Sequence, residues 1–135
     1  MKKIILLALT LIILAACSPT PKVELAGEWK LVSYGDAVHP TAALPDVDTS
    51  IKFDNGQLSG NVGCNSFGGS YKIKGDRITF GPMMSTLMFC ELVSIQEHDV
   101  LAVLSDGADL KIQLSGNTLT LTSADGLSVV NLARK

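Results

Sequence analysis

Four two-residue turns constrain the fold of this chain more than any other feature. Two-residue hairpin loops need positive φ angles, which Asn-Gly, Asp-Gly and glycine-first pairs supply. Such pairs occur at positions 55–56, 75–76, 116–117 and 125–126. Taken as hairpins, these turns place apolar residues opposite one another: Phe53 and Leu58, Ile73 and Ile78, Tyr71 and Phe80, Leu114 and Leu119, Ile112 and Leu121, Leu121 and Val130, and Leu119 and Leu132. The sequence therefore predicts an antiparallel sheet with one apolar face.

One interval breaks this alternation and predicts a helix over about 95–105. Ser94 and Glu97 fit a capping box, in which both side chains satisfy free amides at the start of a helix. Val100 and Leu104 follow at helical spacing. The fold class predicted is α+β, a strongly curved antiparallel sheet or half-barrel of about eight strands wrapped around one short α-helix. The strands are expected at about 27–34, 49–54, 57–64, 70–75, 77–82, 108–115, 118–123 and 127–133.

The N-terminus has the pattern of a bacterial lipoprotein leader. Two lysines precede residues 4–16, which are apolar apart from Thr10. This run is shorter than the ~20 residues that cross a bilayer, so it indicates a signal peptide over residues 1–16. The run ends in Leu-Ala-Ala-Cys, which resembles a lipobox and implies lipidation of Cys17. The alternative is an ordinary cleavable signal. Residues 17–24 are then the lipidated cysteine and a Pro-containing tether.

Location and charge limit the partners of the mature chain. Two or more acyl chains give stable membrane anchoring, so the membrane is the first expected partner. Ser18 stands where an inner-membrane retention signal would place aspartate, so we expect the outer membrane, facing the periplasm. Loss of the two leader lysines changes the net charge from −2 to −4. No basic face for nucleic acid is indicated. We expect a monomer.

The segment 60–71, Gly-Asn-Val-Gly-Cys-Asn-Ser-Phe-Gly-Gly-Ser-Tyr, resembles the META domain, the family that includes HslJ-like heat-shock proteins. Gly-Glu-Trp-Lys-Leu at 27–31, Thr-Leu-Met-Phe-Cys at 86–90, Glu97 and the late strand at 119–121 fit as well, although phenylalanine replaces the commoner alanine before the second cysteine. The resemblance covers about residues 25–133 and assigns 25–135 to a META-like domain. It implies a small antiparallel sheet curled around one helix, a paired cysteine and an envelope or secreted location. The family has no established catalytic chemistry.

Cys64 and Cys90 are expected to form a disulfide. They are the two cysteines left once Cys17 is lipidated, and the compartment is oxidising. A catalytic set of Cys64, His98 and Asn65 is the alternative, but nothing in the sequence brings these residues together. Zinc would need His39 and His98 and lacks the usual cysteine spacing. We predict no catalytic residues, no metal and no cofactor.

The glycine-rich stretch 60–69 has two interpretations. It lacks the lysine-serine ending of a phosphate-binding loop and opens into no helix. We therefore expect a structural corner of the sheet, where Asn65 and Ser66 hydrogen-bond their own backbone.

A methionine-rich run follows the fifth predicted strand. Methionine is used both to fill cores and on adaptable apolar binding surfaces. One interpretation is that the run fills the space between sheet and helix. The other is a hydrophobic binding surface beside the helix, made by Met83, Met84, Leu87, Met88 and Phe89.

The sequence thus favours a non-enzymatic, lipid-anchored envelope protein, a binding or quality-control module for envelope integrity or stress tolerance whose ligand is an envelope protein or a lipid. The alternative is a carrier of a lipid or other small hydrophobic ligand, and a hydrolytic enzyme is a third hypothesis. A deep apolar cavity beside the methionines would favour the carrier.

Overall fold

All four turn signals lie between antiparallel strands in the computed structural model, which describes residues 23–135. Three are two-residue turns, whereas the pair at 125–126 lies in a five-residue connection, residues 123–127, that keeps the predicted register. Every apolar pair predicted across these turns is a register pair, from Phe53 opposite Leu58 to Leu119 opposite Leu132. The turn glycines take the required positive φ, as at Gly56 (79°) and Gly116 (56°). The register prediction is confirmed.

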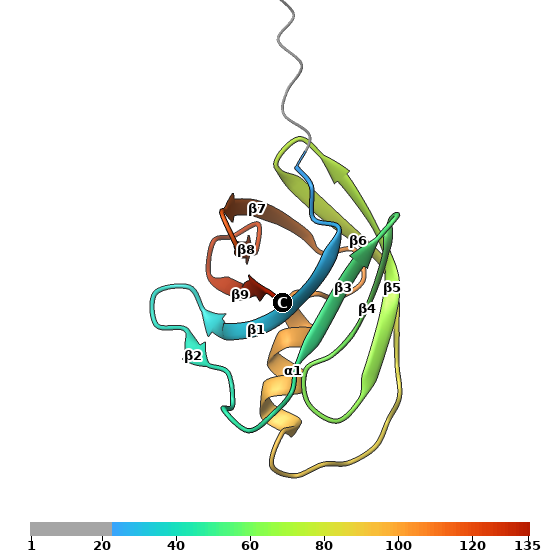
Figure 1. Ribbon diagram of the computed structural model, residues 1–135, viewed down its shortest axis with the longest axis vertical. Coiled ribbons are helices and arrows are strands. Elements are labelled where there is room, and N and C mark those ends of the chain that lie inside the picture. Colours follow the sequence, from blue (N-terminus) through green and yellow to red (C-terminus); the bar gives the residue numbers. More distant parts are fainter. Residues whose placement is uncertain (1–22) are drawn as a thin grey trace, which may run out of the picture.

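The strands form a closed barrel (Figure 1). Neighbouring strands pair in the order β2-β1-β3-β4-β5-β6-β7-β8-β9, and a further β1–β9 ladder closes the sheet into eight barrel strands, with β2 as a short addition to β1. The predicted α+β fold is confirmed, and the closure answers a question that the sequence left open. The elements are β1 (Gly27–Asp36), β2 (Thr41–Ala42), β3 (Ser50–Asp54), β4 (Gln57–Asn61), β5 (Ser66–Lys74), β6 (Arg77–Ser85), α1 (Ser94–Val103), β7 (Asp109–Ser115), β8 (Thr118–Thr122) and β9 (Ser128–Arg134).

Large apolar side chains fill the centre of the barrel. An eight-stranded barrel is about wide enough for side chains to fill it or for one small ligand to bind inside. Here the inward positions are fully buried, Trp29 among them. The largest side chains in this core are Trp29, Phe53, Phe80, Leu25, Ile51, Leu58, Ile78, Leu104, Leu119, Leu121 and Leu132. The interior is therefore a packed core.

The helix covers one end of the barrel, and the described chain starts at the other (Figure 1). Strand β1 runs between the two ends, because Gly27 pairs beside the β3–β4 turn, whereas Gly35 and Asp36 at its other end line a pocket together with residues of α1. Val100 of the helix and Leu104, directly after its last residue, are buried in the core. We call this the helix end of the barrel. The predicted signal peptide (1–16), Cys17 and the tether up to residue 22 lie outside the described residues.

The glycine-rich stretch is part of strands β4 and β5 and of the turn between them. A side chain at Gly60 would collide with the carbonyl oxygen of Ser50 and the ring of Phe67. Glycine is required there because neighbouring strands approach closely. This supports the structural interpretation of the stretch.

Candidate functional site

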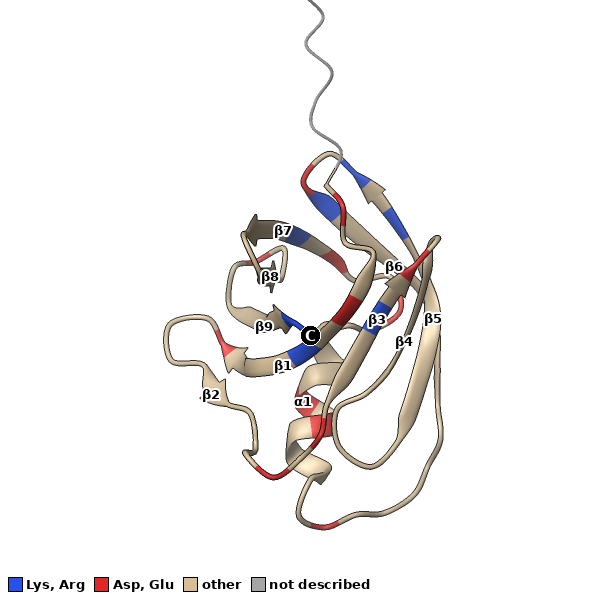
Figure 2. Ribbon diagram, viewed as in Figure 1, with Lys and Arg blue, Asp and Glu red and all other residues tan. Residues whose placement is uncertain are grey.

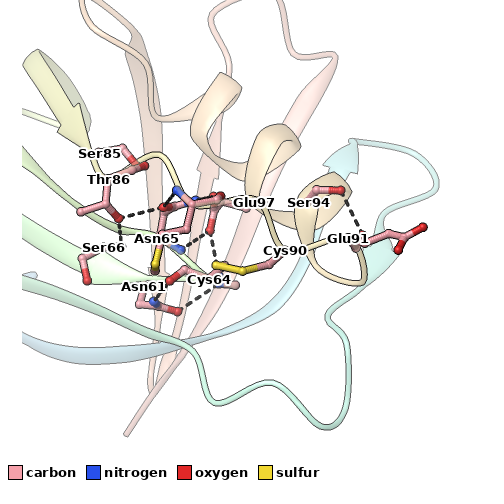
Figure 3. Close-up of a disulfide and its surroundings, with 12 residues drawn as sticks. Asn61, Cys64, Asn65, Ser66, Ser85, Thr86, Cys90, Glu91, Ser94 and Glu97 are labelled. Carbon is pink, nitrogen blue, oxygen red and sulfur yellow. Dashed lines mark hydrogen bonds between the residues drawn. A yellow bond between two sulfur atoms is a disulfide. The ribbon is translucent and has the colours of Figure 1, made fainter.

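Two segments far apart in the sequence are joined at the helix end of the barrel. The β4–β5 turn carries Cys64, and the loop from β6 to α1 carries Cys90 (Figure 3). A disulfide connects them, with a Cα–Cα distance of 6.0 Å and a sequence separation of 26 residues. The loop that contains the methionine-rich run is thus tied covalently to the barrel.

Asn65 holds the same loop by hydrogen bonds (Figure 3). Its Nδ2 donates to the carbonyl oxygen of Met88 (2.9 Å), and its Oδ1 accepts from the Met88 amide (2.7 Å) and from Thr86 Oγ1 (2.8 Å). The second Nδ2 hydrogen goes to Glu97 Oε1 (2.6 Å). The Asn65 side chain is buried, and all its donors and acceptors are used.

The expectation that Asn65 bonds its own backbone at the corner is wrong. The local bonds come from Asn61, whose Nδ2 donates to the Cys64 carbonyl and whose Oδ1 accepts from the Gly63 amide. Asn65 is left to reach across to the other loop. The amide of Ser66 donates to Thr86 Oγ1, which adds to the same clamp.

Glu97 is the acceptor on the helix side. Its Oε2 accepts from the amides of Cys64 (2.8 Å) and Asn65 (2.6 Å), in addition to the Asn65 side-chain bond. Partial burial alone would raise the pKa of Glu97. The hydrogen bonds from the backbone and side chain of Asn65 and from Cys64 outweigh this and hold the pKa below its usual value.

The capping-box prediction for Ser94 and Glu97 is wrong. Val93 precedes the helix without a side-chain cap, and Ser94 Oγ donates to the Glu91 carbonyl. Glu97 turns away from its own helix because the β4–β5 turn presents two amides to its carboxylate.

Gln96 makes a second link that sequence reasoning missed. It is 1% exposed, donates to the Val62 carbonyl (2.6 Å) and accepts from the Leu44 amide (2.8 Å). Gln96 therefore hydrogen-bonds the helix to the β4–β5 turn and to the loop between β2 and β3. A polar residue next to Val100 on the buried face of a helix was the available signal.

The clamped loop presents its apolar side chains to solvent. Leu87 is 96% and Phe89 85% exposed, so filling of the space between sheet and helix is the wrong interpretation for them. Met83 alone of the predicted five packs against the core. Leu92 and Ile95, which the prediction omitted, extend the exposed set. We call these residues the apolar loop surface: Met84, Leu87, Met88, Phe89, Leu92 and Ile95.

A groove of about 500 Å³ lies between this loop and the outer face of α1. We call it the β6–α1 groove. Ser85 and the loop line one side, and the helix residues His98, Leu101 and Ala102 line the other.

The proposed Cys64, His98 and Asn65 set has no free thiol in this structure. Cys64 is in the disulfide, and all hydrogen-bonding groups of the Asn65 side chain are occupied. His98 lines the groove from the exposed side of the helix. Within residues 23–135, no three His, Cys, Asp or Glu side chains are grouped to hold a metal ion.

Comparison with known families places the fold. The sequence profile of the META domain matches residues 23–135, which is every residue that the structure describes. The chain belongs to the META domain family. This confirms the resemblance carried by the Gly-Cys-Asn and Thr-Leu-Met-Phe-Cys segments around the disulfide.

Solved structures resemble this META domain in fold. A protein from Burkholderia xenovorans, solved by NMR, is 21% identical with a TM-score of 0.66, and 81% of each chain is covered. A DUF4847 family protein from Bacteroides vulgatus has a TM-score of 0.60 at 14% identity and covers 82% of this chain and 93% of its own. A lipocalin-like protein from Bacteroides uniformis is 26% identical, with a TM-score of 0.52 and coverage of 82% and 97%. A comparison with curated proteins finds no match.

Two further findings bear on the site. No helix among residues 23–135 combines the length and hydropathy that crossing a membrane requires. Although one similar structure is lipocalin-like, the centre of this META domain is occupied by its own side chains. A ligand in the barrel centre would have to displace that core, whereas the carrier hypothesis places its ligand beside the methionine-rich run, where the β6–α1 groove lies.

Proposed function

We propose that this protein is a lipid-anchored, non-enzymatic protein of the bacterial outer membrane whose META domain binds another envelope protein through the apolar loop surface. One observation carries the proposal. A disulfide and the Asn65 hydrogen bonds hold in place a loop whose large apolar side chains are left in water.

Apolar side chains held in water are unfavourable for the folded protein unless a binding partner covers them. Monomeric proteins rarely expose large contiguous apolar patches, and those that occur mark interaction sites. A loop already fixed in its bound conformation also loses less entropy on binding. The clamp at Met88 and the disulfide at Cys90 have this effect on the loop that carries Leu87 and Phe89.

The position of the surface favours a protein partner over the anchoring membrane. Six residues from Cys17 to Val23 span at most ~20 Å when extended. An anchor at Cys17 would hold the N-terminal end of the barrel close to the membrane. The apolar loop surface is at the helix end, away from that anchor (Figure 1).

The anchor is tested by a single substitution. Cys17→Ala should move the protein from the membrane fraction to the soluble periplasmic fraction and remove the lipid mass from its N-terminal peptide. A wild-type protein with an unmodified N-terminal cysteine would contradict the anchor.

The binding function is tested by photo-crosslinking in intact cells. A photoreactive amino acid replaces Leu87 in one variant and Leu127 in the other, since both leucines are exposed but Leu127 lies in the turn between β8 and β9. We expect one discrete protein adduct from position 87 that position 127 does not form. The adduct should disappear when Phe89→Ser is added. Equal labelling at both positions would refute the binding site.

The carrier hypothesis is an outcome of a parallel measurement. Native mass spectrometry of the domain purified from cells should give the bare protein mass. A stoichiometric lipid adduct that is lost in the Phe89→Ser variant would overturn the protein-binding proposal and favour the carrier.

A further inference from the structure

The two halves of β6 have different surroundings. Residues 77–79 pair with β5 on one side and with β7 on the other. The last contact toward β7 is at Phe80, whose amide donates to the Ala108 carbonyl and whose carbonyl accepts from Gly107. Beyond Phe80, β6 pairs only with β5 within residues 23–135. Residues 81–85 therefore form an open edge in an otherwise closed barrel.

The register shows which groups point to that edge. Between the pairs Tyr71–Phe80 and Gly69–Met83, β6 advances three residues while β5 advances two, which is a β-bulge at residues 81–82. After the bulge, the Thr86 amide donates to the Ser66 carbonyl, so Thr86 and Met84 face β5. The amide and carbonyl groups of Met83 and Ser85 then face away from β5.

This open edge continues into the β6–α1 groove. Ser85 lines the groove, and opposite it stand Ser94, His98, Leu101 and Ala102, which share one face of α1 because Leu101 and Ala102 follow His98 by three and four residues and Ser94 precedes it by four. A segment lying in the groove would have strand groups on one side and a helix face on the other. That is the arrangement in which an extended peptide adds to a sheet edge.

Among the residues that the structure describes, the groove is lined by one acidic residue, Glu97, and by no lysine or arginine, and Glu91 stands in the loop beside it. No lysine or arginine occurs between Ile78 and Leu110, whereas this stretch also contains Asp99 and Asp106 on or after the helix; its remaining acidic residue, Asp109, is paired with Arg77. For the described part of the chain, Figure 2 shows acidic residues at both ends of the barrel, but lysines and arginines only away from the helix and the loop that precedes it. A cationic partner is favoured here, whereas an anionic lipid surface would be repelled.

We propose that the β6–α1 groove binds an extended, apolar and cationic segment of the partner protein, which adds as a strand to the Met83–Ser85 edge of β6. This rests on the proposed function and names the binding mode and the chemistry of the partner. Main-chain hydrogen bonds to Met83 and Ser85 supply the register. The apolar loop surface contacts the alternate side chains of the bound segment.

The probe is a ten-residue synthetic peptide that alternates valine and lysine. All described strands pair within residues 23–135 and enclose one core, so the domain from Ser18 onward folds by itself and serves as the protein. We expect saturable binding by calorimetry. Hydrogen exchange at the Met83 and Ser85 amides should slow at least tenfold when the peptide is bound.

Matched peptides separate the contributions. Alternate backbone amides of the bound peptide point toward β6 or away from it. Methylation of the nitrogens that point toward β6 should weaken binding at least tenfold, whereas methylation of those that point away should not. Replacement of lysine by glutamate should abolish binding. If both methylated peptides bind as tightly as the parent peptide, strand addition is wrong.

A variant of the protein gives an independent test. Ser85→Pro removes the outward amide but not the bonds of Met84 and Thr86 to β5, and should weaken peptide binding at least tenfold. Ser85→Ala keeps the amide and should bind like the wild type. Equal binding by both variants would refute the proposed edge.

The outcomes for the two proposals are distinct. If Leu87 crosslinks a protein in cells but the peptide neither binds nor protects Ser85, strand addition fails and the binding function stands. If position 87 yields no specific adduct, the proposed function fails, whatever the peptide does.

Discussion

Replacement of Asn65 by aspartate is the sharpest test of the clamp. The change keeps the shape of the side chain and both acceptor bonds at Oδ1, from Thr86 and Met88. It removes the two hydrogen bonds that Nδ2 donates, to Glu97 Oε1 and to the Met88 carbonyl. In their place, a second carboxylate faces Glu97.

The expected loss of stability follows from these two contacts. Two charges about 4 Å apart near a protein surface repel by about 4 kcal/mol. The repulsion is limited by protonation, because protonating a carboxyl of pKa about 4 at pH 7 also costs about 4 kcal/mol. The lost bond to Met88 adds about 1–3 kcal/mol. We therefore expect Asn65→Asp to lower the free energy of unfolding by about 5–7 kcal/mol at pH 7, out of a total of about 5–15 kcal/mol for a typical domain.

The assay is urea unfolding followed by the fluorescence of Trp29, the single tryptophan, which is fully buried. Asn117→Asp is the matched control because Asn117 is exposed in the β7–β8 turn. The control should change the free energy of unfolding by less than ~0.5 kcal/mol, as is usual for surface sites. A loss below ~1 kcal/mol for Asn65→Asp, close to the control, would refute the clamp as a source of stability.

Lowering the pH should reduce the difference in the free energy of unfolding between the wild type and Asn65→Asp. Folding places the new carboxyl beside Glu97, so its pKa is raised in the folded state. The penalty is therefore full above the folded pKa and is relieved as the pH falls toward the unfolded value of about 4. If this difference stays constant from pH 7 to pH 4, repulsion between the new carboxylate and Glu97 is not its cause.

Three further outcomes follow from the same contacts. Because the pKa of Glu97 is lowered in the folded state, the carboxylate stabilises the wild type above pH ~4.3 and loses this effect as the pH falls. Glu97→Gln should therefore lower the urea midpoint at pH 7, and its free energy of unfolding should depend less on acid than that of the wild type. An unchanged pH profile would contradict this role. Replacement of Cys64 and Cys90 by serine should cost roughly 3–4 kcal/mol in urea unfolding, since the disulfide closes 26 residues, and a loss under ~1 kcal/mol would argue against the entropic estimate. Gly60→Ala should lower the free energy of unfolding by more than ~2 kcal/mol because its methyl group would meet the Ser50 carbonyl. If the variant instead unfolds at the same temperature as the wild type, the strands can move apart to accommodate the methyl group.

The sheet was predictable because its signals are local. A two-residue turn determines which residues face each other, and an error of one residue would turn every apolar side chain to the wrong face. Phe53 and Leu58 satisfy this condition through their turn alone. Closure depends on β1 and β9, which are about a hundred residues apart and share no turn, so no local signal indicates that they pair.

The clamp was not predictable because each of its residues also fits a local role. Asn65 lies in a glycine-rich corner and Glu97 three residues after Ser94, so short-range bonds were the natural interpretation for both. The structure pairs them across 32 residues because the β4–β5 turn points its amides at the helix. The disulfide was the one long-range link that the cysteine count and the expected compartment could indicate.

The open edge of β6 also explains how the domain can offer a strand site without assembling into extended sheets. Proteins protect exposed edges with bulges, prolines and charged residues. Here the bulge and Pro82 stand directly before Met83, and the chain turns away into the clamped loop after Ser85. Only the outward groups of Met83 and Ser85 remain, too few to pair with a long edge of a second copy. The flanking side chains lack the lysines that usually repel an incoming strand, and the acidic helix end instead attracts one that carries its own positive charge. A short cationic strand fits both constraints.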